Sequence, residues 1–246
     1  MTKCEDNAAR SAPDLAPDRA RKSPVASGIA FLAMVLLGGC AALPHAPVDE
    51  RVARTELLAL LQTLNAELLG HDSATLTLER WCADHHLADP AKILARRVHG
   101  AAIPIPEEVR AALAVGADEP IGYRHVQLVC GEHVLSEADN WYVPGRLTAG
   151  MNRQLDTSDE PFGKVVRPLG FQRRTLSARL LWSPLPAGWE MASDSTPAPA
   201  LRIPHQVLRH EAILYSAAQQ PFSVVVETYT NQVLAFRPEY RRVSDP

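Results

Sequence analysis

Strand-like segments fill the second half of the chain, and they restrict the fold class before any other feature does. β-branched and aromatic residues, bounded by turn-forming residues, predict five strands. These segments are residues 121–130, 134–143, 171–182, 206–215 and 222–229. Gly131-Glu132 is a plausible turn between the first two, and residues 216–221 connect the last two, so each pair is expected to form a hairpin. Because a hairpin joins antiparallel strands, the pattern predicts an antiparallel sheet.

The residues before this region show helical spacing instead. Apolar residues recur at helical intervals over residues 49–69, and Gly70 is expected to end that helix. Asp72 or Ser73 can cap a second helix, and a third follows Pro106. Shorter elements are predicted at residues 92–98 (a strand) and 148–155 (a helix). Because helices precede antiparallel strands, we expect one α+β domain.

An apolar segment near the start of the chain bears on where the protein works. Residues 25–37 are too few to cross a bilayer comfortably as a helix, which takes about 20 apolar residues. Basic residues precede the segment, and it ends in Leu37-Gly38-Gly39-Cys40, which resembles a bacterial lipobox. The order of basic, apolar and small residues is typical of a secretory signal. The alternative is a core helix with a coincidental cysteine.

The lipobox interpretation divides the chain into three parts. Residues 1–39 are expected to be a signal peptide with a polar N-terminal extension, residues 40–49 a lipidated linker, and residues 50–240 the folded domain. Cys40 would carry the lipid (palmitate), and the acyl chains would hold the protein at a membrane surface. We therefore expect a lipoprotein of the bacterial cell envelope, anchored on the periplasmic side.

Composition narrows the choice of partners. Residues 40–246 are enough for one ordinary domain with a real core. The formal net charge is −3 and charges of both signs are interspersed, so we expect no nucleic-acid partner. No motif calls for a cofactor, and we expect none.

Two cysteines remain in the domain, Cys82 and Cys130. In an oxidising compartment they invite a disulfide, but free cysteine is also among the most buried residue types. Each has a histidine three residues later, His85 and His133. Zinc sites usually show tighter and more distinctive spacing than this, so we expect no metal site. The choice between a disulfide and free thiols stays open.

Two charged residues lie in strands that otherwise suit a core. Arg124 alternates with Val126 and Leu128 on the more apolar face of its strand, and Glu227 follows three valines. A guanidinium does not lose its charge, so a buried one needs a partner. Either Glu227 pairs with a cation or it faces a polar pocket. The simplest alternatives are a structural salt bridge between Arg124 and Glu227, or exposure at an edge of the sheet.

Three motifs in fixed order resemble the chorismate–pyruvate lyase family, which removes pyruvate from chorismate to give 4-hydroxybenzoate. The motifs are "YRHVQLVCGEHVLSEADNWYVP", "EPFGKVV" and "PFSVVVETY", and the similarity extends over roughly residues 68–236. The resemblance implies an α+β fold in which an antiparallel sheet, flanked by helices, encloses a small ligand cavity. It places the family's arginine at Arg124 and its glutamate at Glu227. Its apolar contact falls on Phe162, beside Gly163.

The resemblance also implies a role for each of these residues. Arg124 would bind a substrate carboxylate through two parallel hydrogen bonds. Glu227 would meet the hydroxyl or ether end and assist proton transfer. Phe162, with Gly163, would close the apolar wall. The lyases carry a second arginine where this chain reads residues 137–140 as Glu-Ala-Asp-Asn, and Arg146 is the available substitute.

Two functions of different classes follow. The first is a lyase acting on a small cyclic carboxylate. The second is a membrane-tethered lipoprotein that keeps the fold but only binds a ligand or serves a structural role. A closely related fold also serves as the effector-binding domain of bacterial transcription regulators, so such a cavity can bind without catalysing. Fold alone does not decide between them, and whether the chain is an enzyme stays open.

Overall fold

The computed structural model describes residues 50–98, 100, 103–191 and 200–237. All of them lie within one compact unit, residues 45–246. The predicted signal peptide, the linker and Cys40 lie outside the described residues, so they stay predictions. Among the described residues, no helix is both long and apolar enough to span a membrane.

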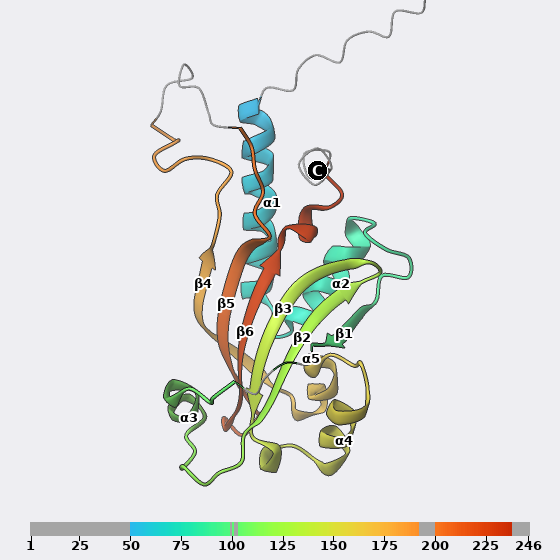
Figure 1. Ribbon diagram of the computed structural model, residues 1–246, viewed down its shortest axis with the longest axis vertical. Helices are drawn as coiled ribbons and strands as arrows, with labels where there is room; N and C mark the ends of the chain where they lie inside the picture. Colours follow the sequence, from blue (N-terminus) through green and yellow to red (C-terminus); the bar gives the residue numbers. More distant parts are fainter. Residues whose placement is uncertain (1–49, 99, 101–102, 192–199, 238–246) are drawn as a thin grey trace, which may run out of the picture. The chain divides into compact units, whose positions relative to one another are not determined.

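The centre of the domain is a six-stranded sheet in which every neighbouring pair runs antiparallel (Figure 1). Its order is β1-β2-β3-β6-β5-β4. The strands are β1 Ile93–Arg97, β2 Gly122–Cys130, β3 His133–Tyr142, β4 Gln172–Leu180, β5 Gln206–Tyr215 and β6 Pro221–Thr230. Both predicted hairpins are present, as β2–β3 and β5–β6. They meet at the β3–β6 pair in the middle of the sheet.

Five α-helices accompany the sheet in the described part of the chain. They are α1 Glu50–Gly70, α2 Ala74–Asp84, α3 Glu107–Leu113, α4 Ala149–Thr157 and α5 Phe162–Val165. The first helix ends at Gly70, as predicted, and Ser73 caps the second by accepting a hydrogen bond from the backbone N–H of Leu76. The fold is therefore α+β, an antiparallel sheet flanked by helices, as the sequence predicts.

The helices divide between the two faces of the sheet. Leucines of α1 and α2 pack with Val126, Leu128, Ala138 and Tyr229, which share one face through the strand register. We call this the helical face. Residues of α4 and α5 extend the same cover at the other end of the strands, against Tyr142 and Leu214. Helix α3 lies on the opposite face, where Trp141, Ile213 and Val224 are buried.

A disulfide joins α2 to the sheet. Cys82 of α2 and Cys130 at the end of β2 are bonded, with their Cα atoms 6.6 Å apart. This settles the choice that the sequence left open between a disulfide and free thiols. The side chain of His85 stacks on the ring of Trp81 instead of turning toward the sulfurs.

Candidate ligand-binding pocket

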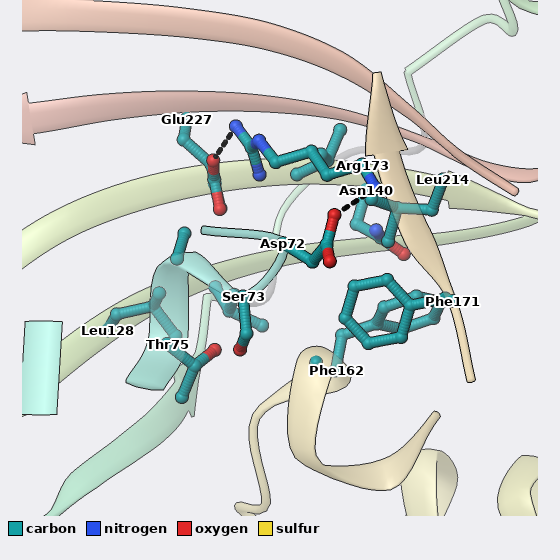
Figure 2. Close-up of a pocket in the computed structure, with 15 residues that line it drawn as sticks. Asp72, Ser73, Thr75, Leu128, Asn140, Phe162, Phe171, Arg173, Leu214 and Glu227 are labelled. Carbon is teal, nitrogen blue, oxygen red and sulfur yellow. Dashed lines mark hydrogen bonds and ion pairs between the residues drawn. The ribbon is translucent and has the colours of Figure 1, made fainter. Parts of the chain in front are cut away.

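A cavity of about 50 Å³ lies on the helical face, where β6 and β3 meet the beginning of α2 and the short helix α5 (Figure 2). Its apolar lining includes Val126, Leu128, Ala138, Phe162, Phe171, Leu214 and Val225. Its polar lining is Asp72, Ser73, Thr75, Asn140, Arg173 and Glu227. We call it the inner pocket. A mostly apolar cavity with a few converging polar groups is the usual form of a small-molecule site.

The charged groups of the inner pocket form a buried ion pair. The guanidinium of Arg173 donates to a carboxylate oxygen of Glu227 over 2.6 Å, and the two side chains are only 4% and 7% exposed. The hydroxyl of Tyr229 donates to the same oxygen over 3.1 Å. Because buried charges are stable only when paired, these contacts let both charges remain under the sheet. In Figure 2 their head groups meet at one end of the pocket, with the rings of Phe162 and Phe171 toward the other.

A buried histidine, His210, lies opposite Glu227 in the strand register and contacts helix α1. His210 of β5 is fully buried, and its Nε2 lies 2.8 Å from the side-chain oxygen of Asn65 in α1. Burial lowers the pKa of His210 to about 4; Glu227 opposes this shift and the nearby charge of Arg173 adds to it. Burial also raises the pKa of Tyr229 well above its ordinary value. The imidazole is therefore neutral near pH 7, and the tyrosine keeps its proton.

The opening of the pocket is formed by the start of α2 and by α5. The backbone N–H of Arg173 donates to Asp72 over 2.8 Å, which fixes the residue before the cap to strand β4. A side-chain carbon at Gly163 would lie 3.2 Å from the hydroxyl oxygen of Ser73, closer than most such contacts. Gly163 therefore permits the close approach of α5 to α2.

A larger hollow of about 290 Å³ lies beside the inner pocket. Its lining consists of His71, Asp72, Ser73, Leu76, Arg80, Arg167, Gly170 and Phe171. We call it the outer hollow. Three residues belong to both linings and form the wall between the outer hollow and the inner pocket: Asp72, Ser73 and Phe171. The sequence analysis gave Asp72 and Ser73 only the role of a helix cap. Ser73 does cap α2, but Asp72 and Ser73 also line the pocket.

Three of the four predicted ligand-contacting residues line the inner pocket: Glu227, Phe162 and Gly163. Arg124 is not among its lining residues, although it lies next to them. It is paired in register with Asn140 and stands two residues before Val126, so all three side chains share the helical face. The predicted roles of these residues in binding or catalysis stay predictions.

The structural salt bridge considered between Arg124 and Glu227 is not what forms, because Glu227 pairs with Arg173. Arg124 is 7% exposed, and its Nε and Nη2 atoms are buried with no hydrogen-bond partner among the described residues. Arg146 does not replace the family's second arginine in the pocket. It donates to the backbone carbonyls of Leu113, Ala114 and Pro221, and so ties together three segments at that end of the sheet.

Arg173 and Asn140 are two polar pocket residues that the sequence analysis missed. Arg173 begins an Arg-Arg pair in a strand, where alternation must place one arginine on each face, and this signal was available. The side-chain oxygen of Asn140 is buried and has no partner in the described part of the chain, while its NH₂ donates to Ser223 over 2.8 Å. A pocket lined by an unpaired acceptor offers a ligand hydroxyl or amide a place to donate.

The size of the inner pocket limits what it holds as it stands. About 50 Å³ is room for a few waters, whereas a known cavity that takes benzene measures about 150 Å³. A ring-bearing ligand therefore requires the pocket to widen. Phe162 and Phe171 are only partly buried at its edge, so their side chains are the ones that can turn aside.

Comparison with known proteins identifies the family of this chain but not its function. No family model matches the chain. The y4mC protein of Sinorhizobium fredii is 54% identical over 189 residues, which cover 75% of this chain and 79% of y4mC. The chain belongs to the y4mC family. Because y4mC is itself described only as uncharacterized, membership of the y4mC family assigns no ligand.

Solved structures match the chain less closely. The effector domain of PhnF from Mycobacterium smegmatis is 12% identical, with a TM-score of 0.41 over 65% of this chain and 89% of that one. The ligand-binding domain of a putative GntR-family transcriptional regulator from Bordetella bronchiseptica is 17% identical, with a TM-score of 0.37 over 57% of this chain and 83% of that one. These TM-scores are too low to indicate what members of the y4mC family bind.

Proposed function

We propose that this protein binds a small cyclic or aromatic carboxylic acid on the helical face of its sheet. The ring would occupy a widened inner pocket, and the carboxylate would reach Arg124. The observation that carries the proposal is the buried guanidinium of Arg124 beside the pocket lining, two of whose nitrogens have no hydrogen-bond partner among the residues that the structure describes. A buried, unpaired cation is costly in a folded protein, and an anionic ligand would remove that cost.

The opposite end of the ligand would meet the Arg173–Glu227 pair. In the register of the sheet, Glu227 lies opposite Ala138, and Arg124 lies opposite Asn140. Ala138 and Asn140 are two residues apart in β3. The two charged groups are therefore two strands and two residues apart on the helical face, and the pocket-lining residues Val126, Ala138 and Val225 occupy the same part of that face. A ring that carries a hydroxyl opposite its carboxylate, as 4-hydroxybenzoate does, has the same order of groups.

Binding without catalysis is the better supported of the two predicted functions. A general acid or base must exchange its proton with the substrate, whereas Oε2 of Glu227 already accepts hydrogen bonds from Arg173 and Tyr229 within the protein. The lyase alternative is favoured by the resemblance to chorismate–pyruvate lyases and by the position of Glu227 in the pocket lining. Release of 4-hydroxybenzoate from chorismate by the purified protein, abolished in Glu227→Gln, would establish the lyase instead.

Titration calorimetry with 4-hydroxybenzoate tests the proposal. We expect binding to the wild type, weakened in Arg124→Ala by about 1.5–3 kcal/mol, the usual worth of a hydrogen bond to a charged group, or roughly 10- to 150-fold in Kd. Arg96→Ala is the matched control, because Arg96 is exposed on the neighbouring strand and should leave the affinity unchanged. Equal affinities in all three proteins, or no binding by the wild type, would refute the proposal.

A further inference from the structure

A second arginine near Arg124 also has a buried nitrogen without a hydrogen-bond partner among the described residues. Arg97 at the end of β1 has a buried Nη2 atom with no hydrogen-bond partner among the described residues. Arg97 is paired in register with Val126, whose side chain lines the inner pocket on the helical face. Arg124 is two residues from Val126 in the same strand, so the two arginines flank one pocket residue.

The described part of the chain supplies no direct counter-ion for this pair of arginines. Neither arginine forms an ion pair within 4.0 Å of a carboxylate among the described residues. The exposed carboxylates of Asp156 and Asp159 favour the charged form of Arg124, but they form no ion pair with it. Burial, followed by the positive charge of Arg97, lowers the pKa of Arg124. A guanidinium nonetheless keeps its proton, so two like charges remain side by side and partly out of water.

The unpartnered nitrogens of the two arginines are arranged in a way that suits an anion. Nε and Nη2 of Arg124 are the two donors of one edge of the guanidinium, which is the edge that grips a carboxylate or phosphate with two parallel hydrogen bonds. Nη2 of Arg97 adds a third donor from the next strand. One singly charged carboxylate would satisfy the edge of Arg124 and leave the charge of Arg97 in excess.

We propose that Arg97 and Arg124 together form a subsite for a doubly charged anionic group, such as two adjacent carboxylates or a phosphate, at the Val126 end of the inner pocket. The inference deepens the proposed function, on which it rests for the ring-bearing part of the ligand. Arg97 would supply the second cationic contact from β1, beside Arg124 of β2. The ligand class narrows accordingly from carboxylic acids to cyclic dianions.

Calorimetry with three probes tests charge recognition directly: benzoate, benzene-1,2-dicarboxylate (phthalate) and phenyl phosphate at pH 7.5. We expect the wild type to bind phthalate and phenyl phosphate at least about tenfold more tightly than benzoate, because a charge-assisted hydrogen bond is worth more than about 1.4 kcal/mol. Arg97→Gln should bring both dianions to within about threefold of benzoate and leave benzoate itself nearly unchanged. Arg96→Gln, one residue away and exposed, should behave as the wild type.

Arg97→Lys separates charge from geometry. It keeps the charge but loses the planar fork, so it should recover only part of the preference for dianions. If Arg97→Gln weakens benzoate and the dianions equally, or leaves the preference intact, Arg97 does not select the second charge and the inference is wrong.

Thermal unfolding with inorganic phosphate gives a second readout that does not need an aromatic ligand. Millimolar phosphate should raise the Tm of the wild type and of Arg96→Gln more than that of Arg97→Gln. Without phosphate, Arg97→Gln should keep or raise the Tm, because removing one charge relieves repulsion. A fall in Tm with no phosphate effect would identify Arg97 as merely structural.

The two readouts distinguish the failure of this inference from the failure of the proposed function. If no aromatic acid binds but phosphate protects the wild type and not Arg97→Gln, the anion subsite stands and the aromatic ligand does not. If benzoate binds through Arg124 with no preference for dianions and no phosphate effect, the proposed function stands and the subsite does not.

Discussion

Glu227 and Arg173 show what a sequence reveals about a buried charge and what it does not. The valines around Glu227 indicated burial, and burial indicated a need for a cation, but the arginine chosen was Arg124. The actual partner comes from β4, two strands away from β6, and its long side chain crosses β5 to reach the carboxylate. The need for a partner is a local property of the sequence, whereas its identity depends on strand order.

His210 should make stability depend on pH. Its folded pKa, lowered from 6.5 to about 4, means that the unfolded chain binds more protons between these values. The free energy of unfolding should therefore decrease as pH falls from about 6.5 toward 4, by up to about 3 kcal/mol if the whole shift is expressed. Glu227, Arg173 and Tyr229 are the charged or titratable groups that face the imidazole.

Urea unfolding at several pH values between 5 and 7 measures this effect, in a range above most carboxylate titration. His210→Gln should have a flatter profile than the wild type, because glutamine can donate to Asn65 but does not titrate. His205→Gln is the control, since His205 is largely exposed. Parallel profiles for the wild type and His210→Gln would show that the buried imidazole does not govern the dependence.

At the level of elements, the local signals were sufficient for most boundaries. The turn at Gly131, the cap at Ser73 and the helix end at Gly70 each depend on a few neighbouring residues, and all three lie where the sequence placed them. The meeting of the two hairpins at β3–β6 has no such local signal. That pairing sets Ala138 opposite Glu227 and Asn140 opposite Val225, all of which line the pocket, and so the pocket wall was beyond prediction from the pattern alone.

The bond between α2 and β2 should contribute strongly to stability. The cysteines are 48 residues apart in the chain, and closing a loop of that length in the unfolded chain is worth about 4 kcal/mol by chain entropy. We expect Cys82→Ser/Cys130→Ser to lose a comparable amount in urea unfolding, with Trp81 beside the bond as a fluorescence probe. Dithiothreitol should lower the unfolding midpoint of the wild type and leave that of the double variant unchanged. A wild-type midpoint indifferent to reductant would contradict the expectation.

At the scale of the whole molecule, we propose that the protein is a lipoprotein of the bacterial cell envelope. The resemblance of residues 37–40 to a lipobox supports this proposal, and so does the disulfide, because disulfides persist mainly in oxidising compartments. The wild type should sediment with membranes and Cys40→Ser should not. Mass spectrometry should find an acylated Cys40 at the amino terminus. Equal membrane attachment of both proteins, with residues 1–39 retained, would exclude the lipid anchor.

The same disulfide has a topological consequence. Residues 82–130 form a covalent ring that contains β1, α3 and β2. A protease that cuts one peptide bond in the exposed turn at residues 116–119 would therefore produce two fragments that remain linked. One fragment would carry Ser73 and Thr75, and the other Arg173 and Glu227. Both walls of the pocket would stay tethered after the backbone had been severed, and would separate covalently only on reduction.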